Sequence, residues 1–279
     1  MPGAGAGLVG VNDVRRNVVE IKDVSKTFPR GNTVALQGID LDIAAGEFIS
    51  LIGPSGCGKS TLLRIIGDLI DPSTGAVTVN GKRSHQARLD RDYAIVFQHA
   101  VLYDWRTVQK NIALPLEMLG WSRQRRAERI REMLELVELT GFENHHPWQL
   151  SGGMQQRVSI ARALSFSPPL LLMDEPFGAL DEMTRERLNM ELLRIWEETR
   201  STIVFVTHSI AEAVFLSTRV VVMSARPGRI AELIRIDLPQ PRTAAMREDP
   251  RFFELITDVR ESLHRGGADE ITDQAMAEA

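Results

Sequence analysis

Residues 53–61, GPSGCGKST, have the types and spacing of a loop that binds phosphate groups. They fit the pattern G-x-x-x-x-G-K-[ST] at every fixed position, in which glycines let backbone N–H groups converge on phosphate oxygens. Lys59 is expected to reach the terminal phosphates, and the Ser60 hydroxyl to bind Mg²⁺. A buried strand is predicted at 47–52 and a helix at 60–69, so the positive end of the helix dipole faces the same anion. The segment therefore predicts a site for a nucleoside triphosphate.

Two acidic residues come directly after a short apolar run. The run, LLLM at 170–173, is continuous, which is typical of a strand covered on both faces. Asp174 is expected to hold Mg²⁺, directly or through water, and Glu175 to point to the opposite side and polarise the attacking water. Two solvated acids at a strand end are the alternative, and the phosphate loop in the same chain favours the catalytic interpretation.

Two polar residues follow other predicted strands and could join this chemistry. Gln98 comes after a strand at 93–97 and can offer its amide oxygen to Mg²⁺. His208 comes after a strand at 202–207 and can contact the terminal phosphate or position the water and Glu175. Each is a weak signal alone, since a lone histidine is more often structural. The other histidines show no metal-ligand spacing.

A second glycine-containing helix start lies at 150–157, LSGGMQQR. Ser151 is a good N-cap, and Gly152 and Gly153 let backbone donors approach an anion closely. An ordinary glycine-rich helix start is the alternative. Because the chain already has a phosphate loop, we expect this helix start to serve a nucleotide held by a second copy of the protein.

Composition and charge exclude a general affinity for nucleic acid. The chain has 279 residues, a formal net charge of −4 and a sequence pI of about 5.9. Residues 122–131 contain five arginines, which could suggest nucleic acid. Glu128 interleaves with them and the opposite helix face is apolar, so a solvated helix face is favoured.

The cysteine count and the hydropathy pattern bear on location. Cys57 is the single cysteine, so no internal disulfide is expected and a reducing compartment is favoured. It is either a small tolerated residue or a thiol whose alkylation would block nucleotide binding. No stretch resembles a bilayer span or a secretory signal. We therefore expect a cytoplasmic protein whose membrane role comes through a partner chain.

The order of predicted strands and helices indicates an α/β fold with two sheets. GIDLDI at 38–43 alternates apolar and acidic residues, and the strand at 76–79 ends in an Asn80-Gly81 hairpin turn, which together predict an antiparallel layer. Continuous apolar runs at 202–207 and 219–223 alternate with helical patterns and predict a mostly parallel sheet.

The chain also divides into regions of different character. These are a loose Gly/Ala-rich segment (1–17), a main domain (18–235) with a helical insertion (about 105–165), an extension with a helix (236–264) and a disordered tail (265–279). The helix at 249–263 has Asp249 as a candidate N-cap and an apolar stripe, which favours a bracing role over a regulatory one.

Taken in order, these motifs resemble those of the nucleotide-binding subunit of ATP-binding cassette (ABC) proteins. The resemblance runs from about Val18 to Arg235. It implies a P-loop NTPase fold of the RecA-like type, in which a mostly parallel core sheet carries an antiparallel β subdomain and an inserted helical subdomain. It also implies an ATPase, with ATP and Mg²⁺ as cofactors and hydrolysis coupled to transmembrane transport.

By position, the resemblance assigns a role to each motif. The segment 53–61 resembles Walker A, Gln98 the Q-loop glutamine and LSGGMQQR the signature motif, while Asp174-Glu175 resemble Walker B with its catalytic glutamate. ALD, ending at Asp181, resembles the D-loop, His208 the switch histidine, and Phe28 the adenine-stacking aromatic, which is often tyrosine in the family. The implied residues are Glu175, His208, Gln98 and Asp181 for catalysis; Ser60, Gln98 and Asp174 for the metal; and Phe28, Gly53, Pro54, Ser55, Gly56, Cys57, Gly58, Lys59, Ser60, Thr61, Ser151, Gly152, Gly153 and Gln155 for the nucleotide.

The resemblance further implies a head-to-tail dimer that holds ATP between the P-loop of one copy and the signature helix of the other. Binding closes the pair, and hydrolysis reopens it. Segments 96–117 and 224–230 are most similar to bacterial importers of nitrate, sulfonate or taurine, which implies a permease, a substrate-binding protein and a place on the inner face of the membrane. Residues 103–105, YDW, replace the usual Leu-Pro-Trp beside the permease groove, so importers of a thiamine-precursor pyrimidine or riboflavin stay open.

Two other classes of protein are less compatible with the sequence. A soluble ABC ATPase acting on DNA or the ribosome usually has coiled-coil arms or two tandem cassettes, and neither is visible here. A P-loop kinase for small molecules would leave LSGG at 150–153 without a role.

Overall fold

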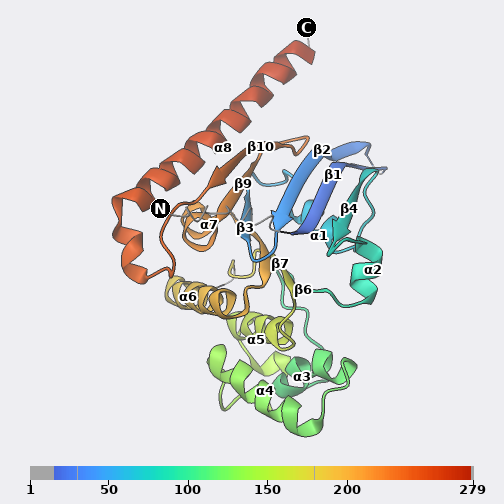
Figure 1. Cartoon of the computed structure of the whole chain (residues 1–279), viewed down its shortest axis with the longest axis vertical. Helices are drawn as coiled ribbons and strands as arrows, with labels where there is room; N and C mark the ends of the chain where they lie inside the picture. Colours follow the sequence, from blue (N-terminus) through green and yellow to red (C-terminus); the bar gives the residue numbers. More distant parts are fainter. Residues whose placement is uncertain (1–15, 30, 179, 278–279) are drawn as a thin grey trace, which may run out of the picture.

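Two sheets and their covering helices make up the fold, and Figure 1 shows them as separate layers. The computed structural model describes residues 16–29, 31–178 and 180–277, with only the course of the backbone from residue 267 onward. The smaller sheet contains β1 (Asn17–Phe28), β2 (Thr33–Ala44), β4 (Thr74–Val79) and β5 (Lys82–Arg83). The larger contains β3 (Phe48–Ile52), β6 (Tyr93–Val96), β7 (Leu170–Asp174), β8 (Thr202–Val206), β9 (Arg219–Met223) and β10 (Ile230–Arg235).

The larger sheet is parallel except at one edge. Its strand order is β10-β9-β3-β8-β7-β6, and only the β9–β10 pair is antiparallel. Every residue of β3, β7 and β8 is buried, because successive side chains enter cores on opposite faces. Leu170, Leu172 and Val204 face one core, while Leu171 and Ile203 face the other. The predicted α/β fold with a mostly parallel sheet is confirmed.

The smaller sheet is antiparallel throughout, as its alternating sequence predicts. Asn80 and Gly81, with φ angles of 53° and 74°, form the two-residue turn between β4 and β5. Both angles are positive, which is what a type I′ hairpin turn requires. The core between the two sheets encloses α1 (Lys59–Ile66), which is shorter than the predicted 60–69 because Gly67 ends it.

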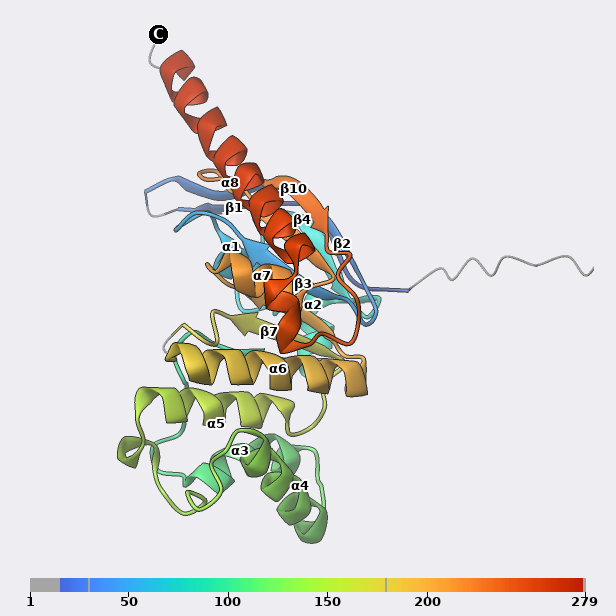
Figure 2. The same ribbon diagram turned by 90° about the vertical axis from the view of Figure 1, so that its left-hand side faces the viewer.

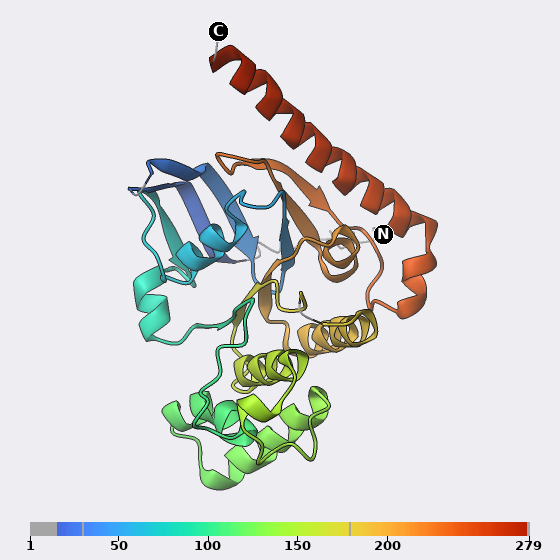
Figure 3. The same ribbon diagram turned by 180° about the vertical axis from the view of Figure 1, so that it is seen from behind.

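The chain between β6 and β7 is helical. It forms α3 (Val108–Met118), α4 (Arg123–Leu136) and α5 (Gly152–Leu164), and Figure 3 shows these green helices at the end of the molecule away from the smaller sheet. The predicted apolar face of α4 is buried at Met133 and Leu134. One turn before Met133, Arg129 donates to the carbonyls of Leu164 and Ser165 and pairs with Glu132, so this arginine binds the protein itself.

The remaining helices lie beside one or the other sheet. They are α2 (Ser84–Leu89), which packs beside β4 and β5 of the smaller sheet, and α6 (Glu182–Thr199), α7 (Ile210–Leu216) and α8 (Pro250–Ala277), with short 3-10 turns at Pro147–Gln149 and Ala244–Glu248. Figure 2 shows α8 running beside β10 and projecting past the sheets. Within the part of the chain that the structure describes, no helix has both the length and the apolar character that crossing a bilayer demands.

Two expectations concern the ends of the described chain. Where a disordered tail is expected from residue 265, the described backbone continues α8 to Ala277, and Arg265 pairs with Glu232 of β10 at 2.9 Å. At the other end, Asn17 already belongs to β1 and pairs with Ala44, so the predicted loose segment does not extend that far. Residues 1–15, 278 and 279 lie outside the described residues.

Candidate active site

The phosphate loop joins β3 to α1, as its sequence predicts. Gly58 is the N-cap of α1 with φ of 93°, and its carbonyl accepts the first helical hydrogen bond, from the Leu62 N–H at 2.8 Å. A Cβ at Gly58 would lie 2.6 Å from Leu36 Cδ2 and 2.8 Å from the Ala35 carbonyl oxygen. Both the backbone angle and the space therefore require glycine.

Lys59 is folded over the loop. Its buried ammonium donates to the carbonyls of Gly53 at 2.9 Å and Pro54 at 3.0 Å, so the cation is held against the backbone of the loop. Cys57 packs in the core between the sheets. Burial of the thiol favours the interpretation of Cys57 as a small packing residue.

Ser60 and Asp174 meet although they are far apart in the sequence. The Ser60 hydroxyl, at the start of α1, donates to Asp174 Oδ1 at the end of β7, at 2.6 Å. Hydroxyl and carboxylate oxygens are hard ligands that suit Mg²⁺, which is commonly held by one or two protein oxygens plus phosphates and water. The pair therefore fits a magnesium ion beside the phosphate loop.

Three further predicted residues converge from the ends of β6, β7 and β8. Gln98 Nε2 donates to Glu175 Oε2 at 3.0 Å, and His208 Nδ1 lies 3.6 Å from the same oxygen. Glu175 itself has φ of 47°, and its N–H donates to the Val206 carbonyl at 3.0 Å. The carboxylate is thus held between an amide and an imidazole, where it could polarise a water molecule.

The signature segment lies apart from the phosphate loop. Ser151 caps α5 by accepting a hydrogen bond from Met154 N–H at 3.3 Å, and a Cβ at Gly152 would meet open space. Gln155 donates to the carbonyls of Pro147 and Leu150, so its amide holds the preceding loop. Figures 1 and 2 show α5 and α1 in different parts of the fold, and no described hydrogen bond or ion pair joins 151–155 to the phosphate loop.

Phe28 and Asp181, the remaining predicted site residues, lie at the end of β1 and at the start of α6. The exposed Phe28 ring ends β1, with the Lys26 ammonium 5.3 Å from its centre, and offers an open face for stacking. Asp181 caps α6 by accepting from Thr184 N–H at 3.0 Å, and that hydrogen bond lowers the pKa of the Asp181 carboxyl. Ala179 of the ALD segment lies outside the described residues.

Two residues near the site escaped prediction. The buried Gln156 side chain on α5 donates to the Phe97 carbonyl at 2.9 Å and so links the signature helix to the segment of Gln98. A Cβ at Gly228, after β9, would lie 2.0 Å from the Cys57 carbonyl oxygen, so only glycine lets this loop pack on the phosphate loop. Both contacts join distant parts of the chain, so the neighbouring sequence does not reveal them. The sequence offered one signal, since Gln156 is a polar residue within an otherwise apolar helix face.

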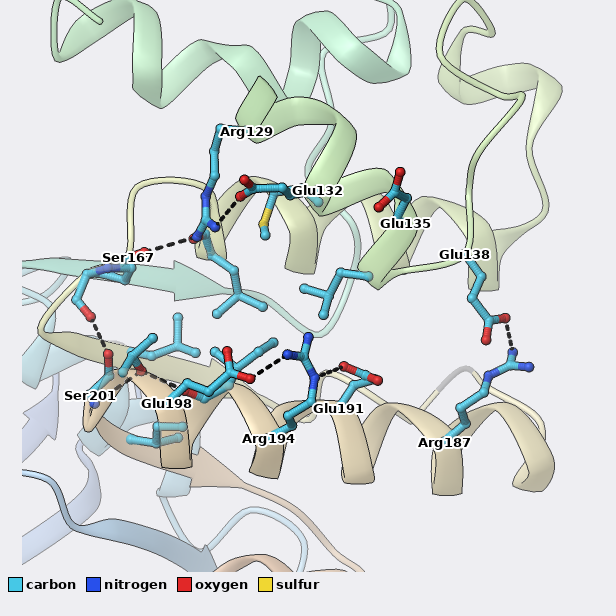
Figure 4. A pocket seen from close by; sticks show the side chains of 18 residues that line it. Arg129, Glu132, Glu135, Glu138, Ser167, Arg187, Glu191, Arg194, Glu198 and Ser201 are labelled. Atoms are coloured by element: carbon cyan, nitrogen blue, oxygen red, sulfur yellow. Dashed lines mark hydrogen bonds and ion pairs between the residues drawn. The ribbon is translucent and has the colours of Figure 1, made fainter. Parts of the chain in front are cut away.

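A hollow of about 590 Å³ lies between α4 and α6, away from the phosphate loop (Figure 4). Its floor is apolar and its rim is charged. The arginines of the rim pair with its glutamates, Arg187 with Glu138 at 2.7 Å and Arg194 with Glu191 at 3.0 Å and with Glu198 at 2.6 Å. Glutamates outnumber arginines in the lining of the hollow, so it does not have the features of a triphosphate site.

Comparison with known proteins agrees with this geometry. The family model described as ABC transporter matches residues 22–178. An uncharacterised ABC transporter ATP-binding protein of Methanocaldococcus jannaschii is 50% identical over 243 residues, which cover 86% of this chain and 90% of the relative. A nitrate import ATP-binding protein of Synechocystis is 42% identical over 91% of this chain and 98% of its own length. An aliphatic sulfonates import ATP-binding protein of Bacillus cereus is 42% identical over 89% and 97%.

A solved structure is also similar. It is a dimeric ATP-binding cassette in a post-hydrolysis state, bound to ADP and Pi. Its TM-score is 0.72 at 37% sequence identity, and the match covers 79% of this chain and all of that one.

Replacing Gly58 with Ala tests the phosphate loop. The added Cβ must displace Leu36 or the loop, so we expect the affinity for ATP to fall at least about tenfold in calorimetric titration. Gly81→Ala is the matched control, because Gly81 also has a positive φ but lies in a surface turn. Equal ATP affinities in the two variants would contradict the assignment of the loop.

Proposed function

We propose a function on the premise that the chain belongs to the ABC transporter family of ATP-binding proteins. We infer that it is the ATP-hydrolysing subunit of a bacterial-type importer that takes up a small solute of the nitrate, sulfonate or taurine class. The observation that carries this proposal is the match to import ATP-binding proteins over nearly their whole length.

The chemistry we propose is attack of water on the terminal phosphate of ATP, which forms a bond from the water oxygen to phosphorus, breaks the bond to the bridging oxygen and releases ADP and phosphate. Lys59 and the backbone of the phosphate loop bind the phosphates, and the Phe28 ring stacks on adenine. Glu175 Oε2, which accepts from Gln98 and faces His208 at 3.6 Å, polarises the water, and His208 contacts the terminal phosphate. Ser60, Asp174 and Gln98 would hold Mg²⁺, which would neutralise charge on the phosphates.

The separation of α5 from the phosphate loop supports a site shared between two copies. Ser151, Gly152 and Gly153 of one copy then contact the nucleotide on the phosphate loop of the other. The open space at Gly152 leaves room for such an approach. Dimeric structures among similar cassettes agree with this arrangement. ATP binds the closed dimer more tightly than the open one in this arrangement. Its binding free energy therefore shifts the two copies toward the closed dimer.

The proposed partners are integral-membrane permease subunits on the inner face of the membrane and, indirectly, a substrate-binding protein. Tyr103 and Trp105 are exposed, with ring centres 4.8 Å apart, in the segment that follows Gln98. Exposed aromatic pairs of this kind suit a protein interface. We assign this surface to the permease.

The importer role has a direct test. A tagged form of this chain, purified from membranes of its native cells in mild detergent, is expected to carry an integral-membrane permease with it. Mass spectrometry of the purified sample identifies the partner. A tagged chain that is active as an ATPase but is recovered without any membrane subunit would remove the transport proposal.

Replacing Glu175 with Gln tests the catalytic role. The amide keeps the size of the side chain but cannot act as a base, so turnover should fall at least about 10²-fold while ATP still binds. An ATP-bound dimer should accumulate, visible by size-exclusion chromatography with light scattering. Glu198→Gln, at an exposed carboxylate that pairs with Arg194, is the control and should keep its turnover. Normal turnover in Glu175→Gln would exclude Glu175 as the catalytic base.

A further inference from the structure

The His208 side chain is 66% exposed, so packing does little to hold it beside Glu175. A catalytic group must nevertheless be placed to within a fraction of an ångström, since a displacement of about 1 Å can cost a factor of 10² in rate. The backbone on either side of His208 must therefore supply the order. Thr207 directly follows β8, which ends at Val206, and Ser209 is the N-cap of α7.

A closed ring of three hydrogen bonds surrounds this backbone. Ser209 N–H donates to Thr207 Oγ1 at 3.0 Å, and Glu212 N–H donates to Ser209 Oγ at 3.3 Å. Thr207 Oγ1 in turn donates to Glu212 Oε2 at 2.6 Å. Thr207 and Ser209, which flank His208, therefore both form a hydrogen bond with Glu212.

The chemistry of a hydroxyl fixes the direction of these bonds. The Thr207 hydroxyl accepts a hydrogen bond from Ser209 N–H through a lone pair. Its own single proton is then available for a second partner, which must be an acceptor. Glu212 supplies the acceptor and is itself 6% exposed. Its other oxygen, Oε1, accepts from Asn189 Nδ2 of α6 at 3.4 Å. Burying a carboxylate costs free energy unless it is hydrogen-bonded. An apolar residue would fill the same space without that cost, so packing alone does not explain a glutamate at this position.

We propose that Glu212, acting through Thr207, is a positioning residue for His208. It fixes the turn at 207–209 so that the imidazole meets Glu175, and through Asn189 it sets the position of this turn against α6, which Asp181 caps. The inference rests on the proposed function of His208. It adds a buried group whose described hydrogen bonds all go to other residues of the chain.

Thr207→Val is the variant that tests this inference. Valine has the shape of threonine and lacks the hydroxyl, so the ring of hydrogen bonds opens without a cavity. We expect kcat for ATP hydrolysis to fall at least about tenfold, with KM for ATP changed by less than about twofold, because the phosphate loop and Phe28 are not involved. Thr207→Ser restores the hydroxyl and should recover most of the turnover.

Thr202→Val is the matched control. Thr202 is a buried threonine at the opposite end of β8, and its hydroxyl accepts one hydrogen bond, from Gly46 N–H at 3.1 Å. It should lower thermal stability by an amount similar to Thr207→Val and keep normal kcat. An equal loss of kcat in both variants would mean that Thr207 matters for the fold alone, and would overturn the inference.

A double-mutant cycle separates positioning from general damage. In a His208→Ala background, Thr207→Val should lower kcat by less than about twofold further, because the group that it positions is gone. If the two losses multiply, Thr207 and Glu212 do not act through His208 and the inference is wrong. If His208→Ala alone keeps normal turnover, the proposed role of His208 fails, and this inference fails with it.

Discussion

Parallel pairing brings the proposed chemistry of this protein to one sheet edge. β3, β8, β7 and β6 are adjacent and parallel, so their carboxyl ends lie together. The phosphate loop follows β3, Gln98 follows β6, Asp174 and Glu175 end or follow β7, and His208 follows β8. Ligands bind at this edge of open α/β sheets for the same topological reason. If one strand were out of register by one residue, its catalytic side chain would turn away from the others.

The rigidity of this edge comes from burial on both faces of the sheet. One core lies between the two sheets around α1, and the other lies between the larger sheet and the helices that follow β6. Tyr93 links the sheet to α1, because its hydroxyl donates a hydrogen bond to the Gly67 carbonyl at the end of that helix. Burial raises the pKa of the Tyr93 phenol to about 12. The strands thus form a fixed base, on which the exposed side chains of His208 and Gln98 can meet the nucleotide.

Local patterns in the sequence were enough to predict the phosphate loop, the buried strands and the Asn80-Gly81 turn, because each depends on neighbouring residues. Contacts between distant segments could not be predicted in this way. The packing of Gly228 on Cys57 and the bond from Gln156 to Phe97 depend on how β9 and α5 are placed by the whole fold. The ion pair of Arg265 in α8 with Glu232 of β10 likewise joins distant segments and lies outside any local pattern.

The proposed nucleotide site is complete only when two copies of the protein share it. A mixture of two variants, both with Glu175→Gln to prevent hydrolysis, tests it most directly. One also carries Lys59→Ala and the other Ser151→Leu, so that only their heterodimer contains an intact phosphate loop facing an intact signature helix. Native mass spectrometry with ATP and Mg²⁺ should detect a heterodimer that holds one nucleotide, with neither variant dimerising alone. Absence of the heterodimer, although Ser151→Leu still binds ATP as a monomer, would contradict the account.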